Sequence, residues 1–136
     1  MESYKAIRRN NPGNIRSGGA RYKGETGSQG GFRVFADASW GFRAMFMLLR
    51  TYRKRHGLVD IRQMLYRYAP PSDGNDTEAY IRFVCKECGM NDYYPLDTED
   101  HDDMVPVVAA MARMEQGQAI DPALVEEGWR RYEEWL

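Results

Sequence analysis

The sequence predicts a mainly α-helical domain of the α+β class, with a small β-rich lobe at its N-terminus. The first 31 residues are rich in Gly, Asn and Ser and contain Pro-Gly and Gly-Gly steps, which are typical of turns and short strands. From residue 38 onward, apolar residues recur at three- and four-residue spacing between capping residues. The length of 136 residues suffices for one buried core, and no repeat or linker divides it, so we expect a single domain over 1–136.

The N-terminal lobe contains one segment with the alternation of a strand, from Gly31 to Phe35. Its aromatic and β-branched residues favour extended structure. We expect this strand to pair with Ile15 and Arg16 in a hairpin or small sheet. The run N-N-P-G-N at 10–14 predicts a turn beside it.

Five helices are predicted after the lobe, each with its own start or stop signal. An aspartate or threonine precedes each helix, where its side chain can cap free backbone N–H groups, and Gly or Pro residues end several of them. The predicted ranges and signals, in chain order, are 38–55 between Asp37 and Gly57, 61–68 between Asp60 and Pro70, a helix from Asp76 or Thr77 to Gly89, one from Asp100 or Asp102 to Gly117, and one from Asp121 to Trp135 with Pro122 in its first turn.

The fourth predicted helix carries an acid, Glu115, at the next position of its apolar stripe. A carboxyl group that a pocket keeps from bulk water favours its neutral form and can donate a proton near neutral pH. Cleavage of a glycosidic bond requires such a donor. The alternative is a solvated side chain in the last helical turn, where a carboxylate opposes the helix dipole. The stripe consists of Met104, Val107, Val108 and Met111.

The lobe also has the composition of a sugar-binding surface. Asparagines around the Pro-Gly turn offer paired donors and acceptors, and aromatic side chains offer flat apolar faces. The alternative is that the asparagines satisfy the backbone of the turn and that the aromatic residues belong to the core. We expect a sugar groove to be lined by Asn10, Asn14, Arg16, Tyr22 and Phe32, with the arginine available for carboxylates.

These motifs resemble two groups of proteins. The run N-N-P-G-N-I-R at 10–16, followed by Gly-Glu-Thr at 24–26 and F-R-V-F-A-D-A-S-W-G-F-R-A-M at 32–45, is similar to the bacterial cell-wall glucosaminidases of the lysozyme superfamily. A second resemblance covers most of the chain. It is to phage and prophage proteins, many of them virion or structural proteins, with R-N-N-N-P-G-N-I-R near the start and A-P-P-S in the middle. Both resemblances imply a lysozyme-like domain.

The resemblance to the glucosaminidases also implies roles for single residues. Tyr68 matches a tyrosine that lines the cleft beside the catalytic acid in that family. Those enzymes carry the acid upstream of the Asn-rich turn, whereas only nine residues precede Asn10 here. The run at 107–117 looks like that acid helix at the other end of the chain, so we hypothesise a circularly permuted fold with Glu115 as general acid. Glu25 is a weaker candidate for a second acid or for positioning water, which a lytic transglycosylase does not need.

Positive and negative charges are divided between the two halves of the chain. Residues 1–67 carry 14 Lys and Arg against 4 Asp and Glu, a net charge of +10, and residues 68–136 carry 5 against 16, a net charge of −11. We expect the halves to attract each other and partly neutralise where they meet. The alternative is that the basic lobe binds an acidic glycan or nucleic acid. The total charge of −1 and the lack of a basic recognition helix make nucleic acid an improbable partner.

Neither a cofactor nor a metal is predicted. Cys85 and Cys88 form a single C-x-x-C, but a structural zinc site normally has a second close pair, so two buried thiols in a reducing compartment are favoured. The acidic run at 97–103 lacks the central Gly of an EF-hand loop. The sequence has no run of about 18 apolar residues that would span a membrane. The apolar core of a signal peptide is also missing.

The function that these patterns favour is cleavage of the glycan strand of bacterial peptidoglycan, by a muramidase, glucosaminidase or lytic transglycosylase. The competing interpretation is a non-catalytic virion, structural or wall-binding protein, with peptidoglycan or other phage virion proteins as partners. In either case we expect a protein that is cytoplasmic when made. It would reach the wall after release, after virion assembly or by non-classical export.

Overall fold

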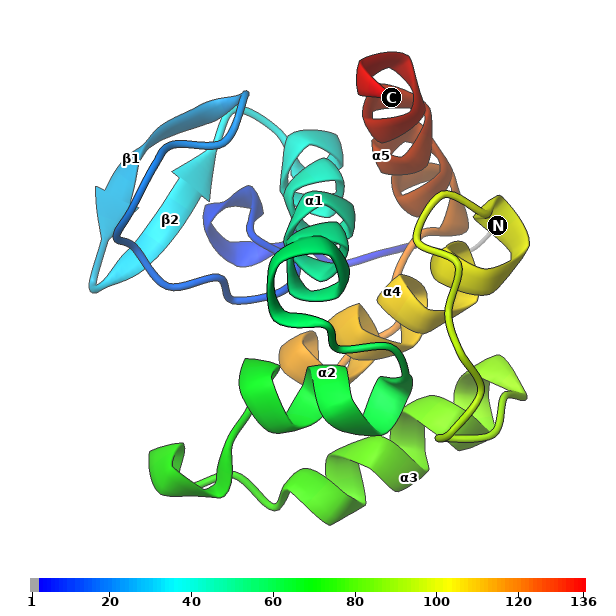
Figure 1. Cartoon of the computed structure of the whole chain (residues 1–136). Helices are drawn as coiled ribbons and strands as arrows, with labels where there is room; N and C mark the ends of the chain where they lie inside the picture. Colours follow the sequence, from blue (N-terminus) through cyan, green and yellow to red (C-terminus); the bar gives the residue numbers. More distant parts are fainter. Residues whose placement is uncertain (1–2) are drawn as a thin grey trace.

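The computed structural model describes residues 3–136 and confirms a mainly helical fold with a small N-terminal sheet (Figure 1). The hairpin lies on one side of α1 and α5 on the other, and α2 and α3 lie below α1 in this view. None of the helices in this range is long and apolar enough to cross a membrane. The elements are η1 (Arg8–Asn10), β1 (Glu25–Gln29), β2 (Phe32–Phe35), α1 (Ala38–His56), α2 (Ile61–Tyr68), η2 (Pro71–Asp73), α3 (Thr77–Cys88), α4 (His101–Gln116) and α5 (Pro122–Trp135).

All five helices begin directly after an aspartate whose carboxylate accepts a backbone N–H of the first turn, as the sequence predicts. Such a cap stabilises a helix by about 1 kcal/mol. The predicted glycine stop of α4 is also confirmed, because the helix ends directly before Gly117, whose φ is 62°. For α4 the cap is Asp100, and α1 extends to His56, one residue beyond its predicted end.

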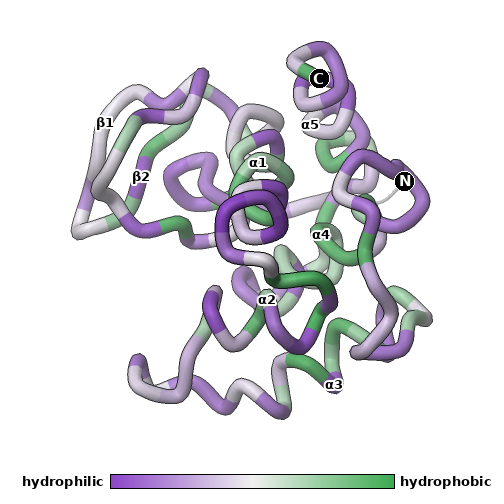
Figure 2. The backbone as a smooth tube through the Cα atoms, viewed as in Figure 1, coloured by the Kyte–Doolittle hydropathy of each residue, from purple (hydrophilic) through white to green (hydrophobic). Residues whose placement is uncertain are grey.

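The core is built around α1, whose inner face packs against α5. The Phe46 ring lies 5.1 Å from the Trp129 ring, edge to face, and 5.7 Å from the Tyr132 ring, stacked on it. The two helix backbones approach closely at Gly128, where a Cβ atom would overlap Cβ of Phe42. Figure 2 shows the hydrophobic stretches of the helices meeting in the middle of the helical part. Full burial of one such side chain contributes about 1.5–3 kcal/mol.

The N-terminal lobe is an antiparallel hairpin of β1 and β2, extended by a bridge between Arg16 and Phe32. The bridge confirms the predicted pairing of the Phe32 strand with residues 15–16. The sequence did not predict β1, because its E-T-G-S-Q residues have no apolar alternation and three of the five are exposed.

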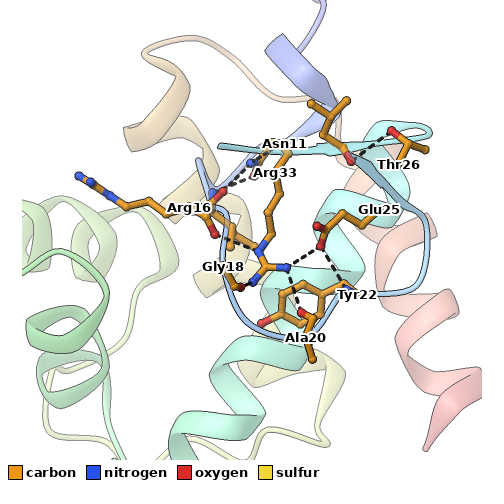
Figure 3. A network of polar contacts seen from close by, with 10 residues as sticks. Asn11, Arg16, Gly18, Ala20, Tyr22, Glu25, Thr26 and Arg33 are labelled. Atoms are coloured by element: carbon orange, nitrogen blue, oxygen red, sulfur yellow. Dashed lines mark hydrogen bonds and ion pairs between the residues drawn. The ribbon is translucent and has the colours of Figure 1, made fainter. Parts of the chain in front are cut away.

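One buried arginine holds the lobe together. Arg33 is 6% exposed, and its guanidinium donates to the carbonyls of Arg16 (2.9 Å), Ala20 (3.0 Å) and Gly18 (Figure 3). It also forms an ion pair of 2.6 Å with Glu25. The loop from residue 16 to residue 25 is therefore fixed by its backbone carbonyls, without a regular structure of its own.

The two oppositely charged halves of the chain meet in ion pairs, as expected. Arg62 of α2 lies 2.6 Å from Glu78 of α3 and 2.7 Å from Asp92, and Lys54 lies 3.8 Å from Glu99. The hydrogen bonds from Arg62, followed by that from Tyr66, lower the pKa of Glu78 to about 2.

Candidate active site

The asparagine turn at 10–14 is held by its own side chains. Asn11 is 1% exposed, and its amide donates to the carbonyls of Ile15 (3.0 Å) and Arg33 (2.9 Å) while its oxygen accepts from the Ile15 N–H (2.9 Å). Asn10 donates to the Phe35 carbonyl over 3.0 Å. Two of the three asparagines therefore fix the turn against β2. This agrees with the alternative that asparagines of the turn bind backbone groups and not a sugar.

The third asparagine, Asn14, faces the end of α4. Its amide nitrogen lies 3.0 Å from Oε1 of Glu115 and 3.3 Å from the Glu115 carbonyl oxygen. The next residue, Gln116, donates to the Pro12 carbonyl over 2.9 Å and to the Asn11 carbonyl over 3.2 Å. These bonds join residues that are more than 100 positions apart in the sequence. The C-terminal end of α4 is thus seated directly on the asparagine turn.

The second oxygen of Glu115 has a partner in α3. The Tyr80 hydroxyl donates to Oε2 over 2.8 Å, and the same hydroxyl lies 3.5 Å from the Met111 carbonyl oxygen. Tyr80 is 4% exposed, and burial raises its pKa well above the ordinary value, with a further contribution from neighbouring Tyr68. The phenol therefore stays neutral and keeps its proton for hydrogen bonding. Both oxygens of the Glu115 carboxyl are oriented by donors from other elements.

Tyr68, at the C-terminal end of α2, also contacts the turn. Its hydroxyl donates to the Gly13 carbonyl oxygen, and a Cβ atom at Gly13 would overlap that hydroxyl. Burial and then the neighbouring Glu115 carboxylate raise the pKa of Tyr68 well above the ordinary value. Tyr68 is therefore a neutral phenol whose oxygen lone pairs remain available to accept from a ligand.

A cavity of about 380 Å³ connects these groups. Its volume falls within the range of small-molecule sites, roughly 300–1,000 Å³. One wall comes from the lobe and the asparagine turn, and the other comes from the helices and the loop after α2. The residues that line it and carry polar or aromatic groups are Asn14, Arg16, Phe32, Tyr52, Arg67, Tyr68, Asp73, Asn75 and Glu115.

Comparison with known proteins relates the chain to a phage protein. Over 122 residues it is 37% identical to Protein P5 of Pseudoalteromonas phage PM2, a match that covers 85% of this chain and 73% of that protein. The chain belongs to the P5 family. No protein-family model matches the sequence. This match confirms the expected relationship to phage proteins.

The P5-family structure brings together five of the predicted site residues and separates three others. Asn14, Arg16, Phe32, Tyr68 and Glu115 line the same cavity. The residues that do not line it are Asn10, Tyr22 and Glu25.

Each of the three separated residues has a place inside the lobe. Asn10 binds backbone carbonyls of the hairpin, and the Tyr22 ring lies 4.9 Å from the Arg33 guanidinium. The Glu25 carboxylate accepts from Arg33 over 2.6 Å and from the Tyr22 backbone N–H over 3.2 Å, and its side chain is 7% exposed. Glu25 therefore binds within the lobe and not at the cavity (Figure 3).

Sequence reasoning missed several residues at the cavity of this P5-family protein. The Tyr80 hydroxyl contacts Glu115, but nothing in the spacing of its helix reveals that contact. Asp73 and Asn75 lie in and after η2, a 3-10 turn that the Pro-Pro signal did not reveal. Their polar character in the A-P-P-S-D-G-N segment was the only available signal.

Potential metal ligands outside the cavity do not assemble. Among residues 3–136, no group of three His, Cys, Asp or Glu side chains could hold a metal ion. Cys85 and Cys88 are free, and burial, followed by the neighbouring Cys88, raises the pKa of the Cys85 thiol to about 11. His101 contacts the carboxylates of Asp102 (2.9 Å) and Glu126 (2.8 Å).

Proposed function

We propose that this P5-family protein cleaves the glycan strand of bacterial peptidoglycan, with Glu115 as the general acid. The observation that carries the proposal is the Glu115 carboxyl at the wall of the 380 Å³ cavity, oriented by Asn14 and Tyr80. Around it are the groups that sugar rings require, namely an amide, a phenol and the Phe32 ring. A pre-oriented acid in such a cavity is the arrangement that protonates a bridging oxygen.

In the proposed reaction, the protonated Glu115 carboxyl donates its proton to the bridging oxygen as the glycosidic bond breaks. The Tyr68 hydroxyl, which donates to Gly13, accepts a hydrogen bond from the substrate, for example from an acetamido N–H. A water molecule or the sugar's own hydroxyl then completes the reaction. Asp73 also lines the cavity and is the candidate for positioning water, whereas we assign Glu25 to the structure of the lobe.

The proposal includes a lysozyme-like fold with a circularly permuted order of elements. It is supported by the contact between Asn14, which follows η1, and Glu115, in the last turn of α4, across a sequence separation of 101 residues. In the glucosaminidases that the sequence resembles, the acid helix comes before the turn. Here the same neighbours would meet from opposite ends of the chain.

Replacing Glu115 by Gln tests the catalytic role. The amide has nearly the same shape but cannot donate the proton, so we expect release of soluble fragments from purified peptidoglycan to fall by about 10²- to 10⁴-fold. Circular dichroism and thermal unfolding should show an intact fold. Glu126→Gln, an exposed change on α5, is the matched control and should leave the rate unchanged. Full activity in the Glu115→Gln protein would remove the proposed role.

A second candidate function is binding to the wall without cleavage. One observation favours it: both Glu115 oxygens accept hydrogen bonds in this structure, which is the pattern of an ionised carboxylate. A wall-binding protein would sediment with insoluble peptidoglycan without clearing its suspension. It would also bind equally well with Gln at position 115.

A further inference from the structure

We infer that the cavity takes glycan strands that carry free carboxylates, and that Arg16 and Arg67 bind these carboxylates from opposite walls. The inference rests on the proposed function and narrows its substrate to an anionic glycan. Both arginines line the cavity that contains Glu115. Arg16 belongs to the N-terminal lobe and Arg67 to the last turn of α2.

Arg16 has a fixed backbone and an exposed side chain. Its backbone forms the bridge to Phe32, and its carbonyl oxygen accepts from Nε of Arg33 over 2.9 Å. Figure 3 shows its side chain pointing away from the Arg33 network. The lobe therefore holds the base of this side chain in place and presents its guanidinium to ligands.

Arg67 is also exposed, and its guanidinium carbon lies 5.5 Å from the centre of the Tyr52 ring. A guanidinium that stacks on an aromatic face keeps its N–H groups pointing outward in its own plane, where a ligand can accept them. Tyr52 itself lines the cavity and is 8% exposed, so it forms a firm support.

Neither arginine has an ion-pair partner among residues 3–136, unlike several other arginines of the protein. Arg33, Arg62 and Arg113 lie 2.6–3.0 Å from carboxylates. The cavity does contain Asp73 and Glu115, but Glu115 is occupied by Asn14 and Tyr80.

Guanidinium groups bind carboxylates in a two-point geometry. Peptidoglycan carries free carboxylates on its peptide stems, whereas a plain N-acetylglucosamine polymer has none. Two arginines on opposite walls would therefore favour the charged polymer.

The experiment compares native peptidoglycan with the same material after carbodiimide-coupled amidation, which neutralises its carboxylates and leaves the glycan intact. Binding is measured by sedimentation in the Glu115→Gln background, so that cleavage does not alter the ligand. We expect amidation to weaken binding by about tenfold or more, the usual effect of losing a charge-assisted hydrogen bond.

Arg16→Gln and Arg67→Gln together should weaken binding to native peptidoglycan to the level of the amidated material and remove the difference between the two. Arg21→Gln, an exposed change in the lobe outside the cavity lining, is the matched control and should bind like its parent. Equal binding of both materials by the parent protein would overturn the inference and leave the proposed function standing. Absence of binding to either material would instead count against the proposed function and the inference together.

A single-stranded DNA oligonucleotide serves as the competing anion. Tight DNA binding that the double variant loses, with no response to amidation of peptidoglycan, would assign the arginines to phosphates and overturn the inference. Retained binding to native peptidoglycan in the presence of excess oligonucleotide supports it.

Discussion

Tyr80 is the residue that lets Glu115 exist in two protonation states without losing its position. When Glu115 is ionised, the hydroxyl donates to Oε2 over 2.8 Å. When Glu115 is protonated, the hydroxyl can turn toward the Met111 carbonyl oxygen, 3.5 Å away, and accept from the acid instead. A hydroxyl is both a donor and an acceptor and can rotate, so it serves both states. We therefore regard Tyr80 as a positioning residue.

Replacing Tyr80 by Phe should lower kcat for cleavage and leave KM nearly unchanged. Oε2 of Glu115 loses its donor from α3, so the carboxyl is held less firmly, whereas the residues that line the cavity are unaltered. Tyr66→Phe is the matched control, because Tyr66 also donates to a carboxylate, that of Glu78, which does not line the cavity. Its kcat and KM should match those of the wild type. An unchanged kcat in Tyr80→Phe would contradict the positioning role.

Single residues also show how far the sequence allows prediction of the site. Glu115 could be identified because its helix is amphipathic and the acid lies on the stripe, a local pattern. Glu25 was also a candidate acid in the sequence. Its partner Arg33 lies across the hairpin, and nothing in the loop sequence reveals that ion pair. Tyr80 was missed because its role depends on how α3 packs against α4.

At the scale of elements, the contact between the asparagine turn and the end of α2 depends on a glycine. Gly13→Ala would place a methyl group against the Tyr68 hydroxyl and the Met45 side chain, both of which are packed in place. We expect the free energy of unfolding to fall by about 1–3 kcal/mol, the usual cost of overpacking. Cleavage should fall as well, because Tyr68 must shift. Thermal or urea unfolding and the fragment-release assay measure the two effects.

The matched control for Gly13→Ala is Gly27→Ala in β1, where an added Cβ meets nothing within 4 Å. The same change of residue should there leave the unfolding free energy within about 0.5 kcal/mol of the wild type. If both variants were equally stable, the close approach of Tyr68 to the turn would not constrain position 13.

The helices were predictable because their start signals are local, an aspartate within one residue of each first turn. The hairpin was less predictable from the sequence, because β1 pairs through its backbone and its residues are polar or small. The cavity was the least predictable element, since its walls combine η2, α2, α4 and the lobe, and their meeting depends on long-range packing.

The whole molecule offers a direct test of the permutation hypothesis. A variant that begins at Pro95, continues to Leu136, and returns through a linker to residues 1–94 would place α4 before the asparagine turn. The new ends fall between exposed Tyr94 and Pro95, outside any helix. Residue 5 lies near the start of α5, since its carbonyl accepts from Gln118 over 3.4 Å. The linker must therefore return along α5, about 21 Å, for which about twelve Gly and Ser residues suffice.

We expect this permuted protein to fold cooperatively, with the circular dichroism of the parent and a cleavage rate within a few-fold of it. The reason is that every helix, the hairpin and the contact between Asn14 and Glu115 are retained. A protein with the native element order and the same linker appended after Leu136 is the control for the added residues. A permuted chain that stays unfolded, although the control folds, would contradict the hypothesis.

The seating of Glu115 on the asparagine turn has a consequence for synthesis on the ribosome. The turn is translated 101 residues before its partner. A nascent chain to which residue 115 has not yet been added contains most of the residues that line the cavity but lacks the acid. The contact between Asn14 and Glu115 can therefore form only after both walls have been synthesised.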